Sequence, residues 1–169
     1  MNYFELFAIP VSLKVNTKEL APRFFELSKK YHPDFFIKDS VEAQAEALEK
    51  SSLLNKAWKT FQSEDATLKY VLQLKNRIEE EEKYELPPDF LMEVLEINES
   101  LMDADEPEVA ENIRSSVNRL YEEIYNPVRQ LVENYKDETV SDTELGQLKE
   151  YYYKKKYLDR ISSQLAGKS

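Results

Sequence analysis

The residue types best suited to chemistry stand together in the stretch KKYHPDFF, which holds the one histidine of the 169-residue chain. Lys29 and Lys30 would occupy the last turn of a helix, where cations suit the negative end of the helix dipole. Pro33 would fix the first bend of the next loop, and Asp34 can accept hydrogen bonds from backbone or from an incoming arginine. Together with His32 they predict a rigid polar projection beside a basic helix, although an isolated tripeptide also fits an ordinary helix-ending turn.

Composition argues against most catalytic chemistry. The chain has no cysteine and two glycines, Gly146 and Gly167, so thiolate sites, disulfides and glycine-built phosphate cradles are excluded. One histidine cannot build a histidine metal cluster. We therefore expect no enzyme activity, no cofactor and no metal; an enzyme using paired carboxylates such as Glu96 and Glu99 stays open as an alternative, without a pocket or cofactor motif to support it.

Charge and hydropathy bear on partners and on location. The net charge of −10 and the pI of about 4.8 would repel a phosphate backbone, so we expect no nucleic-acid partner. The opening residues MNYFELF lack a basic region followed by a long apolar run, and no stretch approaches roughly 18 apolar residues. We therefore expect a soluble protein of the reducing cytoplasm that does not bind membranes.

Charge also divides the chain into two parts. Residues 1–76 carry a net charge of +1 and residues 77–169 a net charge of −11. The break falls in EEEEKYELPPD, where like charges repel and two prolines cannot continue a helix. With strand-like alternation absent, we predict an all-α protein with domains at 1–76 and 88–169 joined by a linker at 77–87.

Capping signals place the helices of the first part. The predicted helices are NYFELFAI up to Pro10, one opened by Asn16 and Glu19 and ending at Tyr31, one opened by Asp39 and Glu42 and ending near Phe61, and ATLKYVLQL after the cap Ser63. Pro22 should bend the second helix. Core contacts of the third helix are expected from Ala47, Leu48, Leu54, Ala57, Trp58 and Phe61.

The second part is predicted to be an antiparallel three-helix bundle. Its helices are one capped by Asp89 and ending near Met102, one begun by Pro107 and reaching about Lys136, and a last one opened by Ser141 and Glu144. Pro127 should kink or divide the middle helix.

The first part resembles the J domain of DnaJ-type co-chaperones. NYFELF matches the opening aromatic-leucine pattern, KKYHPD the end of the second helix, and AWKTF the later alanine-aromatic element. The resemblance implies a helical hairpin that docks on an ATPase chaperone of the HscA and DnaK class and stimulates its ATP hydrolysis. It assigns the switch to His32, Pro33 and Asp34, and electrostatic docking to Arg23, Lys29 and Lys30, which individually also fit a solvated helix face. Many J domains have lysine where this chain has Phe35, which puts docking strength in question.

The helix DFLMEVLEINESLMD carries two apolar arcs when its residues are placed at about 100° intervals. Phe90, Val94, Ile97 and Leu101 form a core stripe, whereas the second arc consists of Leu91, Leu95, Met102 and Met92. Its acidic border is Glu96, Glu99 and Asp103. One bundle face does not need so much apolar surface, so this arc predicts a partner site. The alternative is that it packs against the last helix or the first domain.

As a whole the chain resembles HscB-type co-chaperones, through FLMEVLE and KKKYLDRI in particular. The resemblance implies that the bundle binds an IscU-type iron–sulfur cluster scaffold through Leu91, Met92, Leu95, Glu96, Glu99, Asp103 and Tyr157. The chain lacks the cysteine-rich module of some relatives and the glycine-phenylalanine and zinc regions of general DnaJ proteins. We therefore expect an adaptor between scaffold and chaperone; a J-domain protein for another client and a passive helical scaffold remain alternatives.

Overall fold

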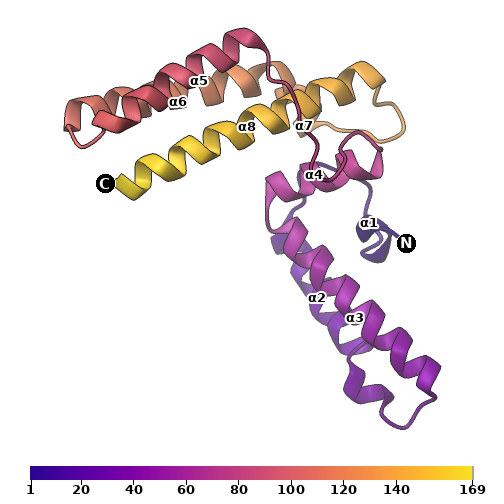
Figure 1. The fold of residues 1–169 in the computed structure, drawn as a ribbon. Coiled ribbons are helices and arrows are strands. Elements are labelled where there is room, and N and C mark those ends of the chain that lie inside the picture. The colour runs from indigo at the N-terminus through magenta and orange to yellow at the C-terminus, as the bar shows by residue number, and fades with distance from the viewer. Residues whose placement is uncertain (169) are drawn as a thin grey trace. The chain divides into compact units, whose positions relative to one another are not determined.

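The computed structural model describes residues 1–168, and all the regular elements in that range are helical (Figure 1). The chain forms two compact units. The first unit comprises residues 1–71 with 136–138, and the second comprises 72–135 with 139–169, of which the last residue lies outside the described range. The domain boundaries predicted from the sequence, at residues 76 and 87, remain predictions. Within residues 1–168 no helix has both the length and the apolar character needed to cross a bilayer.

The first unit is a helical hairpin with short flanking helices (Figure 1). Its elements are α1 (Tyr3–Leu6), α2 (Thr17–Lys30), the 3-10 helix η1 (Pro33–Phe36), α3 (Val41–Phe61) and most of α4 (Glu64–Leu74). Helices α2 and α3 lie side by side, as the J-domain resemblance implies. The hairpin therefore holds the loop between them at one end of the unit.

Aromatic side chains hold the first unit together. Phe4 and Phe61 are almost fully buried, with ring centroids 5.1 Å apart. The ring of Trp58 stacks on that of Phe24 at 4.6 Å, which joins α3 to α2. Leu48, predicted to be a core residue, is instead 62% exposed. This prediction is wrong because Ala47, its neighbour in sequence, takes the inward position on α3 and is 2% exposed.

Side-chain caps begin these helices, with two differences from prediction. Asn16 accepts a hydrogen bond from the Glu19 backbone N–H at 3.3 Å, and Ser63 accepts one from the Ala66 N–H at 3.1 Å, as expected. Ser40 rather than Asp39 caps α3. The first helix ends at Leu6, well before Pro10, and the chain then reaches Ala8 in the left-handed region with φ 53°.

The second unit is a three-helix bundle formed by α5, α6 and α8. In chain order its elements are α5 (Pro88–Ser100), η2 (Leu101–Asp103), α6 (Pro107–Tyr125), η3 (Asn126–Val128), α7 (Arg129–Glu133) and α8 (Asp142–Lys168). Contacts pair the end of α6 with the start of α5, through Arg119 and Glu93 at 3.1 Å. Contacts between α6 and α8 also run in opposite directions along the two helices: the ring centroid of Tyr125 lies 5.7 Å from that of Tyr151, whereas Tyr121, earlier on α6, meets Asp159, later on α8, at 2.6 Å. The helices are therefore antiparallel where they pack on α6.

The ends of these helices show which local signals decide a boundary. Pro127 divides the predicted middle helix into α6 and α7. Ser141 and Glu144 form the predicted capping box, with hydrogen bonds of 2.9 and 3.1 Å. Asp89 does not cap α5, because the helix already begins at Pro88, whose fixed φ and missing N–H suit the first helical position.

The segment predicted as a linker lies along α8 within the second unit. Arg77 pairs with Asp142, and Glu82 accepts hydrogen bonds from Lys149 at 2.6 Å and from the Tyr153 hydroxyl at 3.0 Å. The ring of Tyr84 also stacks on that of Tyr153 at 4.6 Å. We call residues 77–84 the α8 strap. These contacts offset the repulsion expected among its glutamates.

Candidate partner-binding sites

The His-Pro-Asp loop connects the end of α2 to η1. The helix ends at Lys30, and His32 then caps η1 by accepting a hydrogen bond at Nδ1 from the Asp34 backbone N–H at 3.2 Å. With Nδ1 acting as acceptor, the neutral ring carries its proton on Nε2, where it can be donated to a partner. The side chains of His32 and Asp34 are 54% and 78% exposed. The loop is thus locally fixed while both polar groups stay accessible.

Phe35 follows the loop, at the position where many J domains have lysine. Its side chain is 71% exposed, and its ring meets that of His32 edge to face, with centroids 6.3 Å apart. The substitution therefore removes a cation next to Asp34 and places an apolar ring beside the histidine. It does not pull the His-Pro-Asp loop into the core.

The basic residues predicted for docking lie on the surface of α2. Arg23, Lys29 and Lys30 are all exposed, and the two lysines occupy the last turn of the helix. Arg23 and Lys30 are seven residues apart, so they share a face about 10 Å long. The Lys30 ammonium also lies 5.4 Å from the ring centroid of Tyr31. Accessible positive charge thus leads along α2 toward His32.

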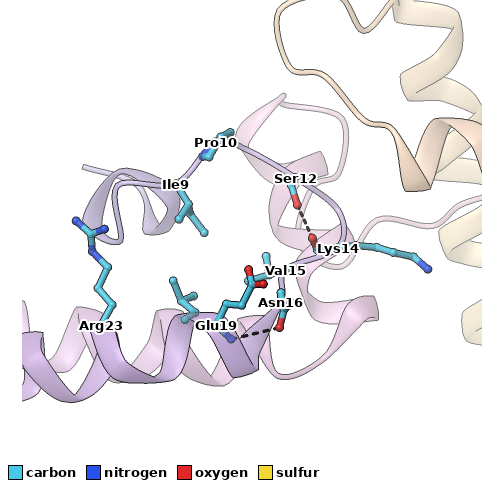
Figure 2. Close-up of a pocket in the computed structure, with 9 residues that line it drawn as sticks. Ile9, Pro10, Ser12, Lys14, Val15, Asn16, Glu19 and Arg23 are labelled. Atoms are coloured by element: carbon cyan, nitrogen blue, oxygen red, sulfur yellow. Dashed lines mark hydrogen bonds between the residues drawn. The ribbon is translucent and has the colours of Figure 1, made fainter.

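A hollow of about 360 Å³ lies between the start of α2 and the preceding segment (Figure 2). Arg23 and Glu19 contribute opposite charges to it, and Ile9 and Leu20 contribute apolar surface. The segment before α2 is ordered by a 2.7 Å hydrogen bond from the Ser12 hydroxyl to the Lys14 carbonyl. Because its charges have both signs, the hollow has no clear preference for an anion or a cation.

The two arcs of α5 have different environments in the bundle. All four members of the predicted core stripe are buried; they are Phe90, Val94, Ile97 and Leu101. Leu91 of the second arc is partly buried and packs against the core. Met92, Leu95 and Met102 are 63%, 48% and 80% exposed. Of the second arc, only Leu91 therefore packs against the bundle core, and Met92, Leu95 and Met102 lie on the surface.

Acidic side chains lie along the same exposed surface. We call it the α5 face and define it as Met92, Leu95, Glu96, Glu99, Met102 and Asp103, all of which are exposed. Met102, which follows α5 in η2, was left out of the predicted scaffold site. It is a member of the second apolar arc predicted from the sequence. Tyr157 of α8 is partly buried against the bundle core, beneath the Arg160 guanidinium at 5.6 Å from its ring centroid.

Several pKa values are shifted in the α8 strap and beside the core of the bundle. Hydrogen bonding from Lys149 lowers the pKa of Glu82, and Tyr153 adds to the effect. Burial, followed by the hydrogen bond to Glu82, raises the pKa of Tyr153 to about 12. Burial and Asp159 raise the pKa of Tyr121. The chain from 1 to 168 contains no group of three acidic or histidine side chains placed to hold a metal ion.

Comparisons with known proteins agree with this architecture. Residues 86–166 match the family model described as the HSCB C-terminal oligomerisation domain. The structure resembles that of the human co-chaperone protein HscB with a TM-score of 0.77 and 29% identity, over 98% of this chain and 81% of the human one. It also has the fold of the chaperone HscB from Vibrio cholerae, with a TM-score of 0.72 and 22% identity over 98% of this chain and 96% of that one. Residues 86–166 therefore belong to the HSCB C-terminal domain family, and the chain resembles HscB co-chaperones over nearly its whole length.

Proposed function

We propose that this protein stimulates ATP hydrolysis by an HscA/DnaK-class chaperone and delivers an IscU-type iron–sulfur cluster scaffold to it. The match to the HSCB C-terminal domain family and the resemblance to HscB co-chaperones support a co-chaperone role in iron–sulfur cluster assembly. The observation that carries the finer proposal is the presence in one chain of an exposed His-Pro-Asp loop and of an HSCB C-terminal domain. In this proposal hydrolysis takes place in the chaperone, and the chain itself catalyses no reaction.

The chaperone contact is assigned to His32, Pro33 and Asp34, with Arg23, Lys29 and Lys30 as docking residues. A fixed loop loses little conformational entropy on binding, which favours affinity from a small surface. The exposed cations of α2 would attract an acidic surface and speed association. Stimulation then requires that the loop bind one state of the chaperone more tightly than the other.

The scaffold contact is assigned to Leu91, Met92, Leu95, Glu96, Glu99, Asp103 and Tyr157. Exposed Met92 and Leu95 supply apolar area that binding can bury, and the carboxylates at the border supply orientation. Leu91 and Tyr157 are partly buried, so they would contribute the floor of the contact rather than its edge.

Joining the two contacts in one chain explains delivery. A scaffold bound to the second unit stays near any chaperone bound to the first, so its effective concentration at the chaperone rises without new contacts. ATP hydrolysis would then trap the scaffold on the chaperone. The proposal therefore needs both contacts to be occupied at once.

An ATPase assay with the full chain, a purified HscA-class chaperone and an IscU-type scaffold tests the proposal. We expect the wild-type chain to stimulate hydrolysis, and His32→Gln to abolish stimulation while calorimetry shows unchanged scaffold binding. Lys69→Gln, at an exposed position on α4, is the matched control and should behave like wild type. Normal stimulation by His32→Gln would reject the J-domain assignment, and absence of scaffold binding by wild type would reject the client.

A further inference from the structure

A second feature adjoins the His-Pro-Asp loop, on the side of α3. A groove of about 440 Å³ is lined by Pro33, Asp34, Ile37, Val41, Gln44, Ala45 and Leu48. Two of these residues belong to the loop itself, so the groove and the loop form one continuous surface. A partner that seats on the loop therefore meets the groove as well.

The apolar side chains of this groove are unusually accessible. Ile37, Val41 and Leu48 are 70%, 79% and 62% exposed. Isolated exposed apolar residues are common, but here Val41 and Leu48 are seven residues apart on one face of α3, with Ala45 between them. The side of α3 that faces the core carries other residues, Ala47 and Leu54, which are buried. The hairpin therefore does not need the groove-side residues for its own packing.

The groove has a fixed shape. The Gln44 side-chain amide donates hydrogen bonds to the Ile37 carbonyl at 3.1 Å and to the Asp39 carbonyl at 3.0 Å. These bonds tie the connector after η1 to the first turn of α3. Ser40 caps the same turn by accepting a hydrogen bond from the Ala43 N–H at 3.1 Å. Ile37 and Val41 are thus held in place as part of a preformed site.

We propose that this groove receives an apolar segment of the ATPase chaperone while the chaperone docks on the His-Pro-Asp loop. This inference rests on the proposed function. The segment would place apolar side chains against Ile37, Val41 and Leu48, and a basic side chain beside them would pair with the exposed carboxylate of Asp34. The loop contact presents mainly the polar groups of His32 and Asp34, so the groove would supply most of the apolar part of the chaperone interface.

A second copy of this chain is the less favoured occupant. The matched family model, described as an oligomerisation domain, covers residues 86–166 and leaves the groove outside it. The groove also shares Pro33 and Asp34 with the loop assigned to the chaperone. Continuity with that contact favours the chaperone.

The first test replaces Val41 and Leu48 together by glutamine, which is accepted in helices. We expect the chain concentration for half-maximal ATPase stimulation to rise about tenfold, because the apolar area of two side chains is no longer buried. Maximal stimulation and the thermal unfolding curve should be retained. Leu74→Gln, which removes an exposed apolar side chain at the end of α4 and outside both assigned contacts, is the matched control. An unchanged half-maximal concentration would overturn the groove proposal.

The second test uses the absence of cysteine from the chain, which allows one reactive position to be introduced at a time. Ala45→Cys carrying a photoreactive maleimide should crosslink to the HscA-class chaperone, whereas Lys69→Cys on α4 should not. Crosslinking to a second copy of the chain, or no crosslink at position 45 while stimulation is normal, would overturn the proposal. Loss of stimulation by wild type would instead reject the proposed function itself, so the two failures are distinguishable.

Discussion

In the first unit the switch assigned to the chaperone contact is a loop, whereas in the second unit most residues of the scaffold contact lie on one face of a helix. The loop is fixed by a hydrogen bond between neighbouring residues, His32 and Asp34, and its chemistry is polar. The α5 face is fixed by the buried stripe on the other side of the same helix, and it mixes apolar and acidic side chains. A short loop can therefore be preorganised locally, but a helix face depends on the whole bundle.

This difference predicts how each site responds to damage in the core. Ile97→Ala in α5 should lower the free energy of unfolding of the second unit by about 2–5 kcal/mol, because Ile97 is 8% exposed and the change leaves a cavity. Scaffold binding should weaken with it, while chaperone stimulation should persist. Chemical denaturation followed by circular dichroism measures the stability. Equal loss of both activities would show that the two sites are not separable.

The next largest effect concerns the α5 face directly. Leu91→Ala combined with Leu95→Ala should weaken scaffold binding by about 2 kcal/mol or more, as loss of interface anchors does. Leu91 is partly buried, so the double variant also loses some stability. The single variant Leu95→Ala, at a 48% exposed position, separates the two effects. Titration calorimetry that gave wild-type affinity for both variants would assign the second arc to the fold alone.

A third prediction addresses the basic face of α2. Replacing Arg23, Lys29 and Lys30 together by glutamine should slow association with the chaperone about tenfold at low ionic strength. The difference from wild type should shrink as salt is added, because mobile ions screen exposed charges. Stopped-flow measurements at several salt concentrations provide the check. A deficit that did not depend on salt would point to a lost direct contact instead of steering.

The smallest expected effect lies in the α8 strap. Because Lys149 lowers the pKa of Glu82 below its ordinary value of 4.5, this contact stabilises the second unit above about pH 4.5 and is lost as the pH falls through the lowered value. Glu82→Gln should therefore flatten the pH dependence of unfolding in acid, by less than about 1 kcal/mol. Glu80→Gln, at an exposed strap position, is the control. If both variants showed the same pH dependence of unfolding in acid, the contact between Glu82 and Lys149 would not contribute to the stability of the bundle.

Most helix signals in the sequence could be interpreted correctly because they are local. Asn16, Ser63 and Ser141 cap helices as predicted, and Pro127 interrupts one. Errors arose where neighbouring residues could fill the same role. Either Asp39 or Ser40 could have capped α3, and the choice depends on backbone angles that composition does not encode.

Burial was harder to predict than helix position, since it depends on whether a partner element is present. Periodicity identified the core stripe of α5 correctly, because α6 and α8 cover that side. It failed for Leu48, which belongs to an apolar face of α3 that lines an open groove. The same limit applies to the α5 face: its residue types indicated a surface, and the bundle was needed to separate Leu91 from Met92.

The stacking of Trp58 on Phe24 means that tryptophan fluorescence reports on only one of the two units. Trp58 is the single tryptophan of the chain, and it belongs to the first unit. Its fluorescence therefore follows the melting of the helical hairpin and is insensitive to the bundle, whose intrinsic emission comes from tyrosines. Tryptophan emission can thus be used to follow unfolding of the first unit without a label.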